Sequence, residues 1–321
     1  MSRRLSIFGV ALFASMFTML MGNAQDSDPS RLHEIVEYFE ERTFQYTAGK
    51  YQDAEIKYRL HTPTSIRYGR KYPLVIHLHG LGEAGSDNTL SLLHFRSILP
   101  VLVGPESEDF FMLVVQCPSE TPAWSFNSAK DGTLDVLMAV MEHVIAENPI
   151  DKKRLTVTGV SSGGAGVWTL LSKYPDTFAG AVPTASSAPS HLPFAALKKT
   201  PIWTFVTNGD VMINRESVQT AMRMVNNSGG SMAITGWDIL DHNTWRHAMR
   251  DHDCLRWMLE QRKGSWFSPP PGIAVHKPQS FLPVFFKYIL PLTIIVITIS
   301  LSLGTICERI SDTWQTVRKR S

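Results

Sequence analysis

The stretch from Leu155 to Trp168 constrains most strongly what this chain can fold into. It reads LTVTGVSSGGAGVW, so a short β-branched run ends at small residues and gives way to an apolar pattern with helical spacing. This order predicts a strand, a sharp turn and a helix. Ser161 lies at the apex, with Gly159 two residues before it and Gly163 two residues after it. GxSxG in this context is the pattern of a serine nucleophile held in a strained turn.

A second serine, Ser162, follows directly and is the alternative nucleophile. The residue two positions before it is Val160, which is too bulky for such a turn. We therefore predict Ser161 as the nucleophile and Ser162 as a donor of its backbone N–H. The competing interpretation, a glycine-rich turn without chemistry, is disfavoured by the flanking strand and helix patterns.

Composition excludes several classes of function. The 321 residues carry a net charge of +2, and no basic stripe is interleaved with aromatic residues, so nucleic-acid binding is disfavoured. Three cysteines, Cys117, Cys254 and Cys307, are too few and too scattered for a disulfide framework or a zinc site. We expect neither a cofactor nor a metal.

The N-terminal residues 1–24 have the pattern of a secretory signal peptide. Arg3 and Arg4 precede an apolar run from Leu5 to Met21, and small residues end at Ala24. The alternative is an uncleaved anchor helix, and in either case the following domain, 25–264, is expected to be exported.

The C-terminal part predicts a membrane anchor. Residues 265–280 form a proline-rich linker, 281–307 are apolar enough to span a bilayer, and 308–321 are a basic tail. Positive charge after the span places this tail in the cytoplasm. The expected protein is a single-pass type I protein of the cell membrane, with its catalytic domain outside the cytoplasm. Cys307, at the inner edge, is a candidate for lipidation.

Between these ends, strand and helix patterns alternate, which predicts an α/β fold with a mostly parallel sheet and helices on both faces. A helix from Ser30 to Glu40 and a hairpin precede the main sheet. The hairpin strands are expected at Tyr46–Tyr51 and Ala54–Thr62. Further strands are predicted at Leu74–Leu78, Phe110–Gln116, Leu155–Thr158, Phe178–Thr184, Ile202–Thr207 and Met232–Ile239, and helices at Gly132–Glu147, through Lys173 after the Ser161 turn, at Glu216–Val225 and at His247–Arg262.

A glycine-rich loop follows the buried strand at Leu74–Leu78 and reads His79-Gly-Leu-Gly82. Such a loop frees backbone N–H groups to point into a site. The amides of Leu81 and Gly82, with that of Ser162, are predicted to form an oxyanion hole. We expect His79 to be a structural histidine that bonds loop carbonyls, rather than a catalytic one.

An acid and a base are expected just past the ends of later strands, with the acid first in the chain. Asp210 follows Ile202–Thr207, and His242 follows Met232–Ile239. Asp210 would orient the imidazole of His242, which would take the proton of Ser161. Alternatives are a turn role for Asp210, Asp241 as the acid, and His247 or His252 as the base.

Here the residues resemble a known family. The chain from about Tyr51 to Met258 is similar to single-domain α/β-hydrolases, a group that overlaps enzymes like polyhydroxybutyrate depolymerases and feruloyl esterases and includes predicted peptidases. The likeness is carried by Tyr72–Asn88 with its HGxGE loop, Val114–Pro118, Thr158–Trp168 with Tyr174-Pro-Asp, and Pro201–Asp210. The resemblance places Ser161, Asp210 and His242 at the triad positions. One departure is Val206-Thr207, where relatives often have His-Gly, and it affects the shape of the pocket.

The expected function is a membrane-tethered serine hydrolase that cleaves carboxylic esters through an acyl-enzyme. No long insertion between Val182 and Thr200 forms a cap domain, so the site should be open. Trp124 and Phe126 are predicted to line the substrate pocket, or else to pack their own loop. The alternatives are a serine peptidase of prolyl-oligopeptidase type and an inactive hydrolase-fold binding module.

Overall fold

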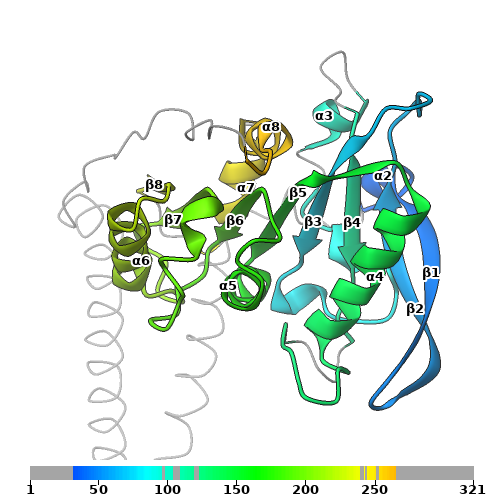
Figure 1. The fold of residues 1–321 in the computed structure, drawn as a ribbon, viewed down its shortest axis with the longest axis horizontal. Helices are drawn as coiled ribbons and strands as arrows, with labels where there is room; N and C mark the ends of the chain where they lie inside the picture. The colour runs from blue at the N-terminus through cyan, green and yellow to red at the C-terminus, as the bar shows by residue number, and fades with distance from the viewer. Residues whose placement is uncertain are drawn as a thin grey trace, which may run out of the picture. The chain divides into compact units, whose positions relative to one another are not determined.

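The computed structural model describes residues 32–95, 98–103, 109–118, 123–238, 242, 244–250 and 253–264. Eight strands form one sheet in the order β1-β2-β4-β3-β5-β6-β7-β8 (Figure 1). The strands are β1 Glu40–Ala48, β2 Tyr51–His61, β3 Tyr72–Leu78, β4 Phe111–Val115, β5 Ile150–Val160, β6 Gly180–Thr184, β7 Ile202–Thr207 and β8 Met232–Trp237.

The sheet is parallel from β4 to β8, and β1 and β2 form an antiparallel hairpin at its edge. Strand β2 pairs antiparallel with β4, with Tyr58 opposite Val115. Residues 51–57 of β2 therefore extend past the carboxyl end of β4. The predicted mostly parallel sheet is confirmed.

Helices cover both faces of the sheet, as Figure 1 shows. They are α2 His33–Val36, α3 Leu99–Val103, α4 Thr133–Glu147, α5 Ser162–Lys173, α6 Arg215–Asn227, α7 Thr244–Arg250 and α8 Asp253–Glu260. Residues of α4, α5 and α6 pack in one buried cluster, and residues of α2, α3, α7 and α8 pack in another.

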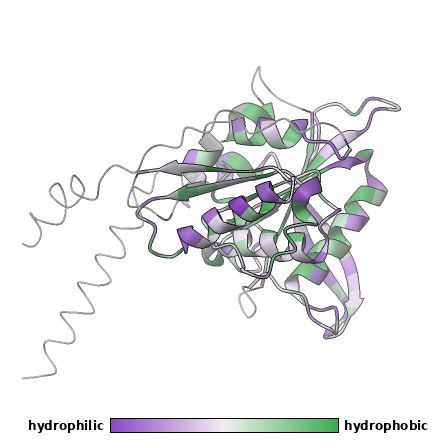
Figure 2. Cartoon of the chain, turned by 60° about the vertical axis from the view of Figure 1, so that its left-hand side comes forward, coloured by the Kyte–Doolittle hydropathy of each residue, from purple (hydrophilic) through white to green (hydrophobic). Residues whose placement is uncertain are grey.

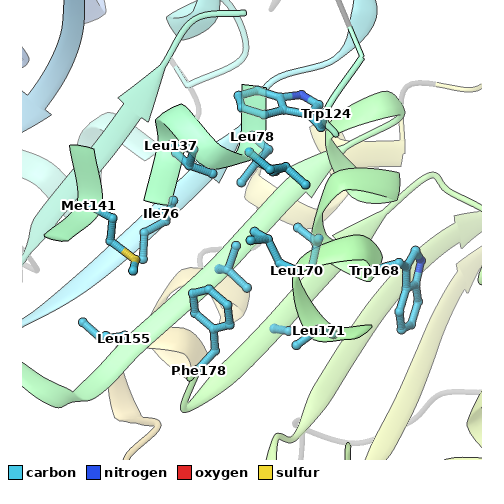
Figure 3. Packing of buried hydrophobic residues seen from close by; sticks show 14 of the residues in the cluster. Ile76, Leu78, Trp124, Leu137, Met141, Leu155, Trp168, Leu170, Leu171 and Phe178 are labelled. Atoms are coloured by element: carbon cyan, nitrogen blue, oxygen red, sulfur yellow. The ribbon is translucent and has the colours of Figure 1, made fainter. Parts of the chain in front are cut away.

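Side chains of β3 alternate between the two faces of the sheet, so this one strand contributes to both buried clusters. Leu74, Ile76 and Leu78 contribute to the cluster that contains α4 and α5, whereas Val75 contributes to the opposite cluster. All seven residues of β3 are buried, as expected of a central parallel strand. Each fully buried aliphatic side chain contributes roughly 1.5–3 kcal/mol. Figure 3 shows this packing between the sheet and the helices, and Figure 2 shows that the helices carry both hydrophobic and hydrophilic stretches.

The predicted helix at Ser30–Glu40 is wrong in extent. Within the described residues, helix α2 covers only His33–Val36, and Glu40 already begins β1. Glu40 pairs with Leu60 of β2, so the ladder of the hairpin begins where helical spacing predicted a further turn. Cross-strand pairing overrides the weak helical signal of this segment.

The first hairpin strand is also misplaced by the pattern. The prediction of Tyr46–Tyr51 spans the observed turn, because β1 ends at Ala48 and β2 begins at Tyr51. Gly49 occupies the turn with φ of +52°, a conformation that glycine adopts readily. The charged start of β1, Glu40-Glu-Arg, concealed its strand character.

The closing segment is two helices, not the single helix predicted from His247 to Arg262. Helix α7 begins earlier, at Thr244, and α8 ends at Glu260. The signal peptide, linker, membrane span and tail that the sequence predicts all lie outside the described residues. In the part of the chain that the structure describes, no helix has the length and apolar character needed to cross a membrane.

Candidate active site

Ser161 lies between β5 and α5 in a strained conformation. Its φ is +54° and its ψ is −116°, values that non-glycine residues rarely adopt. The N–H of Ser161 donates to the carbonyl of Thr184 at 3.0 Å, which anchors the turn to strand β6. The turn therefore holds the hydroxyl above the carboxyl ends of the strands.

The glycines around Ser161 are required by close backbone approach. A Cβ atom at Gly159 would lie 2.4 Å from the carbonyl oxygen of Gly163, and one at Gly163 would lie 2.0 Å from the carbonyl oxygen of Leu78. Real side chains do not tolerate such distances. The spacing that the sequence showed thus has a steric cause in the fold.

Asp210, His242 and Ser161 form a continuous hydrogen-bonded line. The Nδ1 of His242 lies 2.7 Å from Oδ2 of Asp210, and its Nε2 lies 2.9 Å from Oγ of Ser161. Because a carboxylate only accepts hydrogen bonds, Nδ1 carries the proton and Nε2 accepts from the serine hydroxyl. A hydroxyl bonded to an oriented imidazole can lose its proton to that ring as it attacks a carbonyl carbon.

The carboxylate of this line is enclosed and fixed. The side chain of Asp210 has no exposed surface, and that of His242 is 14% exposed. The other oxygen, Oδ1, accepts from the N–H of Met212 at 2.8 Å, which sets the carboxylate plane. Asp210 lies past the end of β7, as the sequence indicated.

The alternative bases and acids lie elsewhere or outside the description. His247 is on α7, where its ring lies 5.2 Å from that of Trp237. Asp241 and His252 are outside the described residues.

The predicted oxyanion groups lie close to the Ser161 turn. Leu81 and Gly82 belong to a 3₁₀ turn after β3, and Leu81 is 60% exposed. Among the described residues, neither of their N–H groups has a hydrogen-bond partner. Ser162 is the first residue of α5, where a backbone N–H has no partner inside the helix. The tight contact of Gly163 with the end of β3 brings this helix start and this loop together.

His79 is structural, as predicted. Its Nε2 accepts from the N–H of Cys117 at 2.8 Å, so Nδ1 carries the proton and donates to the carbonyl of Gly80 at 2.6 Å. Burial lowers the pKa of His79, which keeps the ring neutral near pH 7. The ring therefore ties the loop to Gly80 and Cys117 through its two nitrogen atoms.

Sequence reasoning missed a group of side chains behind His242. The ring of Trp245 meets that of His242 edge to face at 5.7 Å and lies 5.0 Å from the ring of His94. His94 in turn lies 3.1 Å from Glu83 of the glycine-rich loop. Burial raises the pKa of Glu83, but the hydrogen bond with His94, the electrostatic effect of the neighbouring histidines and a hydrogen bond with the backbone of Gly80 together bring the pKa below its usual value. Trp245 follows His242 by three residues, and this proximity was the available signal.

The two aromatic residues predicted to line the pocket have different surroundings. Trp124 is 6% exposed, and its indole N–H donates to the carbonyl of His79 at 2.9 Å. Phe126 packs against Tyr174, with the ammonium of Lys173 3.7 Å from its ring centre. A cavity of about 420 Å³ lies next to the glycine-rich loop after β3, and of these two residues only Trp124 lines it.

Across the described residues, no cluster of three or more His, Cys, Asp or Glu side chains suits a metal ion.

Comparisons with known proteins agree with this fold. The prolyl oligopeptidase family matches residues 124–238. A thermostable esterase is 27% identical with a TM-score of 0.64, and the match covers 72% of this chain and 64% of that one. This chain thus spans less than two thirds of that esterase. No curated protein matches the sequence significantly.

Two further solved structures share the fold at lower identity. A ferulic acid esterase is 14% identical with a TM-score of 0.55, over 69% of this chain and 97% of that one. The acylaminoacyl peptidase of Pyrococcus horikoshii is 16% identical with a TM-score of 0.51, over 74% of this chain and 44% of that one. By the family match and the thermostable esterase, the chain is similar to the esterase- and peptidase-like group of the α/β-hydrolases, and the sheet order agrees with that fold.

Proposed function

We propose that this protein is a serine hydrolase that cleaves carboxylic esters through an acyl-enzyme. Ser161 is the nucleophile, His242 the general base and then acid, and Asp210 the group that orients the imidazole. The proposal rests chiefly on the line of hydrogen bonds from Asp210 through His242 to Ser161, of 2.7 and 2.9 Å. Distances of this size are those of an activated nucleophile and its base.

In the proposed reaction, Ser161 attacks the ester carbonyl while its proton passes to Nε2 of His242. The oxyanion forms opposite the N–H groups of Ser162 and Leu81, with Gly82 as a further donor. The imidazolium then protonates the departing alcohol, and water repeats the sequence to release the acid. Each step uses groups that already lie at one edge of the sheet.

An ester substrate is favoured over a peptide by the surface beside the site. Val211 and Met212, next to Asp210, are 86% and 64% exposed, and Leu81 is 60% exposed. Such an apolar rim suits an alkyl or aryl group more than a charged peptide. The match to the prolyl oligopeptidase family supports the second candidate, a serine peptidase with the same three residues.

Turnover of p-nitrophenyl esters and of peptide amides by the purified protein tests the proposal. Rapid ester hydrolysis that His242→Ala reduces to near background is expected, with little amide cleavage. Faster amide cleavage would favour the peptidase. A protein that hydrolyses neither and takes no fluorophosphonate label would be the third candidate, an inactive binding module.

We also propose that the domain is exported and tethered to the membrane. Support comes from the sequence of residues 1–24 and 281–307, which have the patterns of a signal peptide and a spanning helix. The basic residues after the span favour a cytoplasmic tail.

A further inference from the structure

A cavity of about 420 Å³ lies beside the glycine-rich loop, within the usual range of ligand pockets, roughly 300–1,000 Å³. Its walls come from the overhanging start of β2, the loop after β3, the end of β4 and the first turn of α4. Trp124, Ile56, Val115 and Val136 supply apolar surface. Ser161, Asp210 and His242 are not among its lining residues.

Several polar groups that line this cavity are already hydrogen-bonded or neutral. The amide of Gln116 donates to the carbonyl of Glu83 and to Asp87. The hydroxyl of Thr133 donates to a backbone carbonyl, and burial raises the pKa of the Cys117 thiol to about 12, so the thiol stays neutral. Oδ1 of Asn88, a further lining residue, is buried and has no partner within the described part of the chain. The paired groups and the apolar side chains together favour apolar contact for a ligand.

The charged residues of β2 that border the cavity do not select a charged ligand. Glu55 and Lys57 alternate with Ile56 along the strand, so their side chains point to the face of the sheet opposite to that of Ile56. Lys57 pairs there with Glu41 at 3.7 Å, whereas Ile56 packs against the buried cluster that contains Trp124. The ligand that fits best is a neutral group with alkyl or aryl surface.

The cavity lies within reach of the proposed oxyanion hole. Gly85, which lines it, follows Leu81 by four residues, a span of at most about 14 Å even if extended. The N–H of Gly85 donates to the carbonyl of Cys117 at 2.8 Å, which ties the loop to the cavity wall. Trp124, bonded to His79 of the same loop, forms a fixed aromatic wall over Leu78 (Figure 3).

We propose that this cavity is a distal subsite that binds the neutral alkyl or aryl end of a long ester substrate. The inference rests on the proposed esterase function and narrows its substrate class to esters that extend well beyond the scissile carbonyl. The bound group is an apolar chain in either case, whether it belongs to the acyl part or to the alcohol part of the ester.

The test compares chain lengths in the full-length protein and in variants that fill the cavity. Ile56→Trp fills it from β2, and Ser86→Trp narrows it from the loop. Gln45→Trp is the matched control, because Gln45 is exposed on the adjacent strand and is not part of the lining. Circular dichroism and melting temperature check that each variant folds.

The expected result is a kcat/KM for p-nitrophenyl dodecanoate or dodecyl acetate that falls at least tenfold in Ile56→Trp and Ser86→Trp, mainly through KM. Hydrolysis of p-nitrophenyl acetate should change less than twofold, and Gln45→Trp should match wild type throughout. A fall with dodecanoate alone assigns the acyl chain, and a fall with dodecyl acetate alone assigns the alcohol. Equal loss for short and long esters would overturn the subsite.

Calorimetric binding of decan-1-ol separates this inference from the proposed reaction. Binding that Ile56→Trp abolishes and Gln45→Trp retains supports the cavity even if no ester is hydrolysed, in which case only the proposed function fails. Ester turnover without chain-length dependence and without decan-1-ol binding leaves the reaction intact and refutes the subsite.

Discussion

At the residue scale, the proposed chemistry depends on one strained serine, Ser161. The positive φ of Ser161 is maintained by its bond to Thr184 and by two neighbouring glycines that leave room for backbone contact. Strain of this kind costs roughly 1–3 kcal/mol and persists only where the surroundings enforce it. The packing of the rest of the fold thus offsets the cost of this strained backbone and fixes the position of the Ser161 hydroxyl.

The two adjacent serines should differ sharply in function. We expect Ser161→Ala to abolish labelling by a fluorophosphonate probe and to reduce kcat by on the order of a million-fold, by analogy with other serine hydrolases. Ser162→Ala should retain substantial activity, because its proposed role uses the backbone N–H. Both are measured by ester turnover and gel-based labelling. Continued labelling of Ser161→Ala would refute the assignment.

A methyl group at Gly163 should disrupt the turn. Its Cβ would overlap the carbonyl of Leu78 at 2.0 Å, so Gly163→Ala should lower the free energy of unfolding by about 1–3 kcal/mol, as for other overpacked sites. Gly82→Ala is the control for stability, because nothing lies within 4 Å of the position that its methyl group would take. Urea denaturation measures both. Equal free energies of unfolding for Gly163→Ala and Gly82→Ala would show that the backbone at Gly163 lies farther from Leu78 than the structure indicates.

The strained turn at Ser161 could be predicted from the sequence, whereas the contact between Trp245 and His94 could not. Glycine spacing is a local consequence of backbone contact, so it is visible in the chain. The contact of Trp245 with His94 joins residues on separate elements through side-chain packing, and no periodic pattern encodes it. Such partners are found only once the elements are placed.

At the element scale, the loop after β3 is held by its own carboxylate. Burial alone raises the pKa of Asp87, but hydrogen bonds from two backbone amides, a threonine hydroxyl and the Gln116 amide lower it to about 2. This same loop carries the proposed oxyanion donors. Its order therefore depends on the ionised form of Asp87.

Acid should weaken this loop in a predictable range. Because the pKa of Asp87 is lower in the folded protein than its ordinary value of 3.8, its stabilisation is present above about pH 4 and is lost as the pH falls towards 2. Asp87→Asn should reduce the drop in melting temperature between pH 5 and pH 3, measured by scanning calorimetry. Glu142→Gln, on the exposed side of α4, is the control. An unchanged acid slope in Asp87→Asn would contradict the prediction.

The limits of a strand could be predicted where the strand is buried throughout, but not where only pairing with a neighbouring strand sets them. Strand β7 matches its predicted limits, Ile202–Thr207, because all six of its residues are buried and Pro201 and Asn208-Gly bound the run. Strand β1 was missed at its start, because Glu40 and Glu41 give no strand signal and only the ladder with β2 orders them. Residues 239–241, near the proposed base, lie outside the described part.

At the scale of the whole molecule, three buried histidines link stability to pH. Burial lowers the pKa of His61, His77 and His79, most strongly at His77. The unfolded chain therefore binds more protons than the folded one as the pH falls through about 6.5. The free energy of unfolding should decrease from pH 7.5 to pH 5.

His77→Leu should make this dependence shallower, because the imidazole in contact with Phe95 would no longer titrate on unfolding. The exposed His191 supplies the control, His191→Leu, which should keep the wild-type slope. Chemical denaturation at several pH values measures both. If wild type and both variants showed the same change in the free energy of unfolding with pH, the buried His77 would not be a source of that pH dependence.

The proposed membrane topology is testable on the intact chain. Full-length protein should resist extraction from membranes by carbonate, and its mature N-terminus should lie near Gln25. A chain that ends at Gly264 should be soluble and fully active, because the last described helix, α8, is complete at Glu260. Release by carbonate, or an intact Met1, would count against the topology.

The order of the strands also determines how this molecule can form. Strand β3 lies between β4 and β5, both of which follow it in the chain. Its neighbours are thus synthesised after it, and closing such long segments is slow. The glycine-rich loop follows β3 and Ser161 follows β5, so the two come together only once β3 and β5 have paired. Enzymatic activity should consequently return at the same rate as native tryptophan fluorescence during refolding, with no earlier active intermediate.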